Sequence, residues 1–324
     1  MRSLATILVV CTLASCRPAP GTPGAGPVVV RVGHFPNITH GQALVAHQMS
    51  RRGQGWFEER LGPGVGLEWF VYNAGPSAME AIFAGSLDLT YVGPSPAINA
   101  YARSDGEEIR IIAGSASGGA ALVVQGDGPI RTAADFRGRK VATPQLGNTQ
   151  DVACRAWLKQ QGYTVTQTGG DVLVVPTANP EQLSLFQKGE LDAVWTVEPW
   201  VSRLEMEAGG RVFLDERDAV TTVLVASSRF LTEQRALAKR FAAAHAELTT
   251  WIAANPEQAE ELASAELQDE TGRPVPPELM ARAWPRLKLE TETPRDALGR
   301  YVDDAIAAGF LRPPLDLSRL TETP

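Results

Sequence analysis

Short apolar runs alternate with helical apolar spacings along the first third of the chain. Runs rich in β-branched residues predict strands, and apolar residues three or four positions apart predict helices. The predicted strands cover residues 28–32, 67–72, 87–92 and 109–113. The predicted helices cover residues 37–50 and 76–84 and begin at residues 98–102. This alternation predicts an α/β protein with a mainly parallel sheet flanked by helices.

A second alternating block begins near Leu122. Its predicted strands cover residues 122–124, 140–143, 172–175 and 193–197, and its helices cover residues 149–161 and 180–188. An apolar run at residues 222–226 predicts a strand that leads back to the first block. From residue 232 the pattern is helical, with a long apolar face that Pro256 ends or kinks.

The second block is inserted into the first, because the chain returns to the first block after it. This arrangement predicts two α/β lobes joined by two crossing segments. The first lobe is expected to hold residues 28–117 and 222–324, and the second lobe residues 118–221. The crossing segments lie near residues 115–122 and 218–226. Ligands bind beyond the carboxyl ends of parallel strands, so the expected ligand site is the cleft between the lobes.

The N-terminus has the features of an export signal at residues 1–16. One Arg precedes an apolar stretch that is too short to span a bilayer. The stretch ends in Leu-Ala-Ser-Cys, which resembles a bacterial lipobox, so Cys16 is the expected lipidation site. The alternative is a plain secretory signal with a chance cysteine. Residues 17–27 are rich in Pro and Gly and predict a flexible tether.

Composition and charge exclude several functions. The chain has 324 residues, 44% hydrophobic and 21% charged, which is typical of a globular protein. The formal net charge of −7 argues against a nucleic-acid partner, which needs a basic surface. Beyond the signal, Cys154 is the only cysteine, and its apolar helical surroundings predict a buried side chain without a disulfide.

Short motifs follow one another in a fixed order along both blocks. The first block has Arg-Val-Gly-His at residues 31–34, Ala-Gly-Pro-Ser-Ala-Met-Glu-Ala-Ile at 74–82, Gly-Ser-Leu-Asp-Leu at 85–89 and Gly-Pro-Ser-Pro-Ala at 93–97. The second has Ile-Arg-Thr-Ala-Ala-Asp-Phe-Arg-Gly-Arg-Lys-Val-Ala at residues 130–142, Gly-Asn-Thr-Gln at 147–150, Gln-Lys-Gly-Glu-Leu-Asp-Ala at 187–193 and Glu-Pro at 198–199, and Asn-Pro-Glu follows at 255–257. Together these motifs resemble the periplasmic substrate-binding proteins of ABC importers, in the nitrate, sulfonate and taurine branch.

The resemblance covers roughly residues 30–225 and implies both a fold and a function. The implied fold is the two-lobe periplasmic binding protein fold of type II, which thiamine-pyrimidine-synthesis-like proteins share. The implied protein is a monomer that binds a small molecule and delivers it to a transmembrane permease and its ATPase subunit.

Candidate ligand-binding residues of the first lobe follow its predicted strands. Asn37 and Thr39 either cap the first helix or leave its N–H groups free for an anion. His40 is expected to donate to a ligand oxygen. His34 stands where the resembling proteins often carry Tyr and is expected to line the cleft.

Two serines complete the first-lobe candidates. Ser95 lies in a Pro-flanked loop after a strand, where its hydroxyl can donate to an oxyanion or accept from an amine. Ser117 lies near the first crossing, next to Gly118 and Gly119, whose backbone freedom suits a hinge.

In the second lobe, Asn148, Thr149 and Gln150 follow a glycine at the start of a helix, where free N–H groups and a positive dipole end favour an anion. Asp151 in the same turn either caps the helix or repels an anion.

The resemblance also places Glu198 at the cleft, where it either accepts from a ligand amine or holds the lobe interface. Trp195 and Trp200 are aromatic candidates for the cleft lining.

No catalytic, metal or cofactor motif stands out in the sequence. Gly-x-Ser-x-Gly, His-Glu-x-x-His and Walker A patterns are missing, and His34, His40 and His47 do not have a strong metal-site spacing, although His40 and His47 could share one helix face. We therefore expect a binding protein without metal or cofactor rather than an enzyme. A cytosolic enzyme of the pyrimidine-synthesis type is the competing reading, and the export signal argues against it.

The expected function is an exported, membrane-anchored lipoprotein that delivers a small organic anion or zwitterion. Aliphatic sulfonates, taurine-like compounds and nitrate suit the hydroxyl, amide and helix N-terminal groups of the candidate loops, and Glu198 with Asp151 would favour a zwitterion. The alternatives are a pyrimidine thiamine precursor, an aromatic compound, or a role as the ligand-presenting partner of a sensor kinase.

Overall fold

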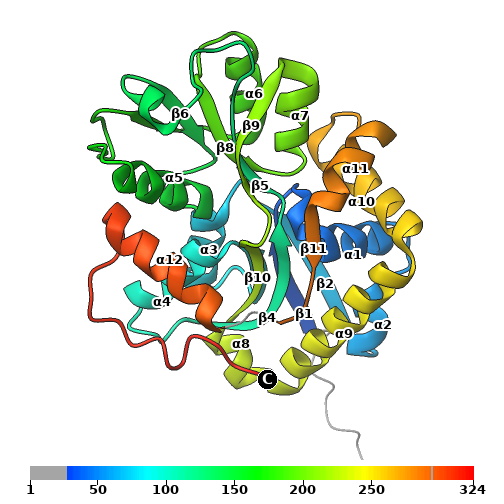
Figure 1. Ribbon diagram of the computed structural model, residues 1–324. Helices are drawn as coiled ribbons and strands as arrows, with labels where there is room; N and C mark the ends of the chain where they lie inside the picture. Colours follow the sequence, from blue (N-terminus) through cyan, green and yellow to red (C-terminus); the bar gives the residue numbers. More distant parts are fainter. Residues whose placement is uncertain (1–27, 293–294) are drawn as a thin grey trace, which may run out of the picture.

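The computed structural model describes residues 28–292 and 295–324. The predicted signal, Cys16 and the tether at residues 17–27 therefore lie outside the described residues. The chain forms two α/β lobes, each built on one sheet with helices on both faces (Figure 1). Among the described helices, none is both long and apolar enough to cross a lipid bilayer.

Lobe A, the lower lobe of Figure 1, has a sheet in the order β11-β4-β10-β3-β1-β2. Its strands are β1 (Val28–His34), β2 (Val65–Val71), β3 (Leu89–Val92), β4 (Ile109–Gly118), β10 (Val220–Ser227) and β11 (Leu287–Leu289). One face packs against α1 (Gly41–Arg51), α2 (Trp56–Leu61), α9 (Arg235–Ala254) and α10 (Pro256–Thr271). The other face packs against α3 (Gly75–Phe83), α4 (Pro94–Arg103) and α12 (Arg295–Ala308).

Lobe B, the upper lobe, has a sheet in the order β7-β6-β8-β5-β9. Its strands are β5 (Ala120–Gln125), β6 (Lys140–Thr143), β7 (Leu173–Pro176), β8 (Ala193–Val197) and β9 (Gly210–Glu216). The flanking helices are α5 (Thr149–Gln160) on one face and α6 (Asn179–Gln187) and α7 (Trp200–Ala208) on the other. The shorter helices are α8 (Ser228–Glu233), α11 (Pro277–Ala283) and the 3-10 helices η1 (Ile38–His40), η2 (Ala133–Phe136) and η3 (Trp284–Arg286).

The chain crosses between the sheets twice, and the crossings explain why both sheets are mixed. Only Gly119 separates β4 from β5, and only residues 217–219 separate β9 from β10. The strands β1 to β4 and β6 to β9 run toward the crossing region, whereas β5 and β10 start there and run away from it. Each of these two strands is therefore antiparallel to both of its neighbours.

Strand alternation divides the apolar residues of lobe A between two cores. In β10, Leu224 and Ala226 face the core below α1 and α9, whereas Val223 and Val225 face the core below α3 and α4. Both pairs are fully buried, which is the pattern of a central strand covered on both faces.

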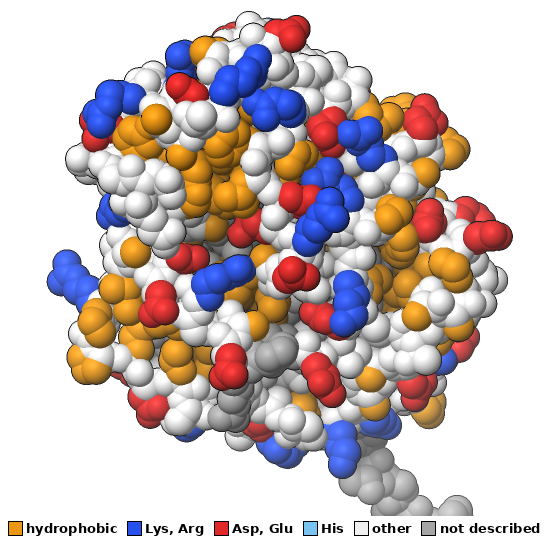
Figure 2. Space-filling model, in the orientation of Figure 1, with side chains coloured by type: hydrophobic (Ala, Val, Ile, Leu, Met, Phe, Trp, Pro, Cys, Tyr) orange, Lys and Arg blue, Asp and Glu red, His pale blue; other side chains and the backbone are white. Residues whose placement is uncertain are grey.

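The C-terminal part of the chain contacts both lobes. Helix α12 packs against α4 of lobe A and α5 of lobe B, and the Lys159 ammonium on α5 donates to the Ala307 carbonyl at 2.9 Å. On the opposite side, α11 packs against α7. On the face shown in Figure 2, basic and acidic side chains are interspersed, without the continuous basic surface that a nucleic acid would need.

Candidate ligand-binding site

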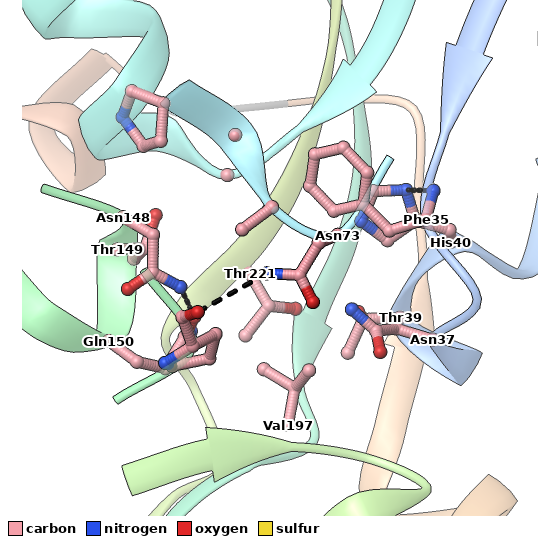
Figure 3. Close-up of a pocket in the computed structure, with 15 residues that line it drawn as sticks. Phe35, Asn37, Thr39, His40, Asn73, Asn148, Thr149, Gln150, Val197 and Thr221 are labelled. Atoms are coloured by element: carbon pink, nitrogen blue, oxygen red, sulfur yellow. Dashed lines mark hydrogen bonds between the residues drawn. The ribbon is translucent and has the colours of Figure 1, made fainter. Parts of the chain in front are cut away.

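A small cavity lies between the lobes, where the carboxyl ends of the parallel strands meet (Figure 3). Lobe A contributes the loops that follow β1, β2 and β3, and lobe B contributes the loop after β6 and the end of β8. The lining residues are Phe35, Asn37, Thr39, His40, Asn73, Ala74, Gly75, Gly93, Pro96, Pro144, Asn148, Thr149, Gln150, Val197 and Thr221.

Three helices begin at this cavity. Gly75 is the first residue of α3, Gly93 precedes α4, and Thr149 is the first residue of α5. The first N–H groups of a helix have no acceptor within the helix and carry its positive dipole end. The N–H groups of Gly75, Thr149 and Gln150 have no hydrogen-bond partner among the described residues.

The polar side chains that line the cavity are uncharged. None of these described lining residues is Asp, Glu, Lys or Arg. The Asn148 Oδ1 accepts the Asp151 N–H at 2.9 Å, and its Nδ2 donates to Gln150 Oε1 at 3.0 Å. Burial holds the pKa of His40 well below its usual value, so the imidazole is neutral at pH 7. Its Nδ1 accepts the Phe35 N–H at 3.4 Å, which leaves Nε2 as the protonated nitrogen.

Direct contacts across the cleft hold the lobes together in this conformation. The Asn73 Nδ2 donates to the Pro144 carbonyl at 3.2 Å, and the Ser95 N–H donates to Thr149 Oγ1 at 3.3 Å. The cavity volume is about 20 Å³, whereas a single water needs roughly 10–15 Å³. A ligand with several heavy atoms can therefore enter only when the lobes separate.

The structure brings together predicted candidates from both lobes. The candidates that line the cavity are Asn37, Thr39, His40, Asn148, Thr149 and Gln150. Two further candidates lie one contact away from it. The Trp200 indole donates to Asn37 Oδ1 at 3.2 Å, and Ser95 is buried, with a hydroxyl that has no partner among the described residues.

The structure places the other candidates away from the cavity. Ser117 lies within β4 and pairs with β10 and β11, so it is a sheet residue. Trp195 belongs to the core between the lobe B sheet and α5, and its indole donates to Glu216 Oε2 at 3.0 Å. The Glu198 carboxylate accepts from the Ser202 hydroxyl and N–H on α7. His34 points toward His47 on α1, where its Nε2 lies 3.1 Å from His47 Nδ1.

Asp151, which could repel an anion, is neutralised by an arginine within lobe B. Both Asp151 oxygens lie 3.0–3.1 Å from Arg155 Nε, and they also accept from Thr143 Oγ1 and the Gly147 N–H. Neither Asp151 nor Arg155 lines the cavity. The charges of this buried pair therefore cancel behind the helix N-terminus.

Sequence reasoning missed Asn73, Thr221 and Phe35, which also line the cavity. Asn73 immediately follows the predicted strand at residues 67–72, so its position at a carboxyl strand end was the signal that could have found it. Thr221 lies on β10, and only the pairing of β10 beside β3 brings it to the cavity.

Two α/β lobes around a cavity at the carboxyl strand ends define the class of periplasmic binding protein folds. The chain belongs to the NMT1-like family, whose model matches residues 24–267.

Among curated proteins, the chain is 30% identical over 163 residues to a protein of Escherichia coli (strain K12) assigned as aliphatic sulfonates-binding, with 49% of each chain covered. It is 26% identical over 152 residues to the taurine-binding periplasmic protein of the same strain, covering 47% of this chain and 45% of that protein. The chain thus spans about half the length of the curated relatives it matches. These relatives are named as binding proteins, which agrees with the expectation that the chain is not an enzyme.

Among solved structures, the alkanesulfonate-binding protein SsuA from Xanthomonas axonopodis pv. citri bound to MOPS superposes with a TM-score of 0.75. The match has 18% sequence identity and covers 93% of this chain and 100% of that chain. At this identity the likeness establishes the fold.

Proposed function

We propose that this protein is the exported solute-binding component of an ABC importer and that the interlobe cavity binds a small oxyanion, in particular an aliphatic sulfonate. The observation that carries the proposal is the convergence of three helix N-termini on a cavity lined by neutral amide and hydroxyl groups. Unpaired N–H groups at the positive ends of helices bind anions without a basic side chain. The names of the sulfonate- and taurine-binding relatives support the same ligand class.

The position of the acidic side chains favours a simple anion over a zwitterion. Asp151 is paired with Arg155, and Glu198 bonds to Ser202, so neither carboxylate is available to a ligand ammonium group. The amide oxygens of Asn37 and Gln150 already accept hydrogen bonds from neighbours. Alkanesulfonates or nitrate therefore fit the cavity better than taurine does.

Two variants that each add one negative charge test this proposal. Gln150→Glu places a carboxylate in the cavity, and Gln160→Glu makes the same change at the exposed far end of α5, about 15 Å away. We expect ethanesulfonate at 100 times its Kd to stabilise the wild type by about 2.7 kcal/mol in thermal unfolding. Gln150→Glu should weaken ethanesulfonate binding at least tenfold, while Gln160→Glu should bind as the wild type does.

The ligand panel also contains nitrate, taurine, a pyrimidine thiamine precursor and an aromatic carboxylate. Equal sulfonate affinity in Gln150→Glu and the wild type would show that the cavity is not an anion site. Stabilisation by the pyrimidine or the aromatic compound alone would agree with a binding protein but would contradict the proposed anionic ligand.

We also propose that a lipid on Cys16 anchors the protein next to its permease and ATPase partners. The expression host should process the wild type to a chain that begins with a lipid-modified Cys16 and sediments with membranes. Cys16→Ser should be found in the soluble extracytoplasmic fraction with no lipid mass. A wild-type chain without lipid by intact-mass measurement would indicate a plain secretory signal.

A further inference from the structure

Two histidines and two glutamates converge between the lobe A sheet and its covering helices, away from the ligand cavity. His34 ends β1, His47 lies on α1, and Glu266 and Glu270 lie four residues apart on one face of α10. One potential ligand atom from each side chain lies within 4.8 Å of all the others. None of the four residues lines the cavity between the lobes.

Most of the distances within this cluster are slightly shorter than the edges of a small coordination polyhedron. His34 Nε2 lies 3.1 Å from His47 Nδ1 and 2.9 Å from Glu270 Oε1. His47 Nδ1 lies 2.6 Å from Glu266 Oε1 and 3.3 Å from Glu270 Oε1. With metal–ligand bonds of about 2.0–2.2 Å, the edges of a tetrahedral zinc site measure about 3.3–3.6 Å. Shifts of a few tenths of an ångström in side chains bring these pairs to that geometry.

Hydrogen bonds among the four groups leave one carboxylate oxygen unsatisfied. The Glu270 side chain is 1% exposed, its Oε1 lies 2.9 Å from His34 Nε2 and 3.3 Å from His47 Nδ1, and its Oε2 has no hydrogen-bond partner among the described residues. The contact between the two ring nitrogens accommodates one proton, so the two imidazoles cannot both donate along it. A buried carboxylate oxygen without a donor is costly, and a cation bound by one atom of each side chain adds a positive charge next to both carboxylates.

The surroundings fix the cluster in the manner of an outer coordination shell. Arg51 Nε donates to both Glu266 oxygens at 2.9 and 3.0 Å, which orients that carboxylate. The Trp69 ring stacks on His47, with 5.1 Å between ring centroids and an interplanar angle of 18°. Beside the cluster, a surface depression of about 530 Å³ is bordered by acidic side chains, which favour the approach of a cation. These acids are Glu257, Glu260, Glu261 and Asp269.

We propose that His34, His47, Glu266 and Glu270 form a binding site for a divalent transition-metal ion, with Zn²⁺ as the best match, that ties α10 to β1 and α1. Two imidazoles and two carboxylates are a donor set that zinc accepts, whereas Ca²⁺ and Mg²⁺ prefer oxygen ligands throughout. The site is structural because the four protein ligands fill a tetrahedral shell and leave no position for a substrate. This inference does not depend on the solute that the interlobe cavity binds.

Zinc titration of untagged, EDTA-treated protein tests the proposal, with two variants. Glu270→Gln removes one ligand, and Glu233→Gln is the matched control because that side chain is exposed and lies outside both the cluster and the acidic depression. Calorimetry should show one Zn²⁺ per chain for the wild type and Glu233→Gln. The affinity of Glu270→Gln should be at least about 100-fold lower, since even outer-shell substitutions at metal sites cost 10–100-fold.

Unfolding measurements keep the test valid if a variant changes the stability of the chain. The measurement compares the stability that zinc adds to each variant, with the zinc-free form of the same variant as the reference. Zinc should stabilise the wild type more than it stabilises Glu270→Gln, because a folded chain that binds the ion more tightly gains more free energy from it. The proposal fails if the folded wild type binds no zinc, or if Glu270→Gln binds it as tightly as the wild type does.

Discussion

Glu198 directly follows β8, and its backbone hydrogen bonds link it to the crossing residue Gly119 and to lobe A. Its N–H donates to the Gly119 carbonyl at 2.8 Å, and its carbonyl accepts the Ile38 N–H at 2.9 Å. Burial raises the pKa of its carboxyl group to about 7, although the bonds from Ser202 and the nearby charge of Arg286 act in the opposite direction. The side chain therefore belongs to the lobe junction rather than to the ligand.

This raised pKa makes the stability of the protein depend on pH in a defined direction. Between the usual pKa of 4.5 and the folded-state value of about 7, the folded chain keeps a proton that the unfolded chain releases. Stability should therefore fall as pH rises through this window and level off above it. Glu198→Gln should remove about 3 kcal/mol of this loss, measured by urea unfolding at several pH values from 4.5 to 8. Parallel stability curves for Glu198→Gln and the wild type would contradict this assignment.

Strand alternation explains why the structure places His34 away from the cavity. Val30, Val32 and His34 share one face of β1, which packs against α1 and α10 rather than facing the cleft. By contrast, the glycine before Asn148 and the polar residues after it carry a local signal for a helix start, and the predicted residues Asn148, Thr149 and Gln150 line the cavity. No local pattern shows that Thr221 or Phe35 meets residues from the opposite lobe.

At the scale of elements, local patterns predicted the strands with strong apolar runs and the helices with clear periodicity. Strands β1 and β8 and helices α5 and α6 lie close to their predicted ranges, and α10 begins at Pro256, where the break was expected. The sequence did not reveal α2, α7 or β9. Helix α2 is short, and all residues of β9 are half-buried, which weakens the alternation that marks a strand. The antiparallel placement of β5 and β10 depends on the crossing and cannot be read from either segment alone.

At the scale of the whole molecule, the conformation described here has the lobes in contact. Hydrogen bonds join loops of lobe A to loops of lobe B at both sides of the cavity, through Asn73 with Pro144 and through Trp200 with Asn37. Helix α12 packs against helices of both lobes, so separation of the lobes requires it to shift against α5 or α4. The short crossings at Gly119 and at residues 217–219 are the positions at which the backbone can bend.

Ligand binding should therefore change the shape of the molecule. We expect the radius of gyration from small-angle X-ray scattering to decrease when ethanesulfonate saturates the wild type, because the ligand favours the closed state over the open one. The Gln150→Glu variant, measured at the same ethanesulfonate concentration, serves as the control and should show a smaller decrease. An unchanged radius in the wild type with confirmed binding would show that the lobes do not move.

The small volume of the cavity has a kinetic consequence. A solute held between the lobes leaves when the contacts between Asn73 and Pro144 and between Ser95 and Thr149 break. Its residence time is then set by how often the lobes open, and opening also breaks the contacts of the solute with one of the lobes. A solute with stronger contacts to both lobes would keep them closed for longer, so discrimination among solutes would occur during release.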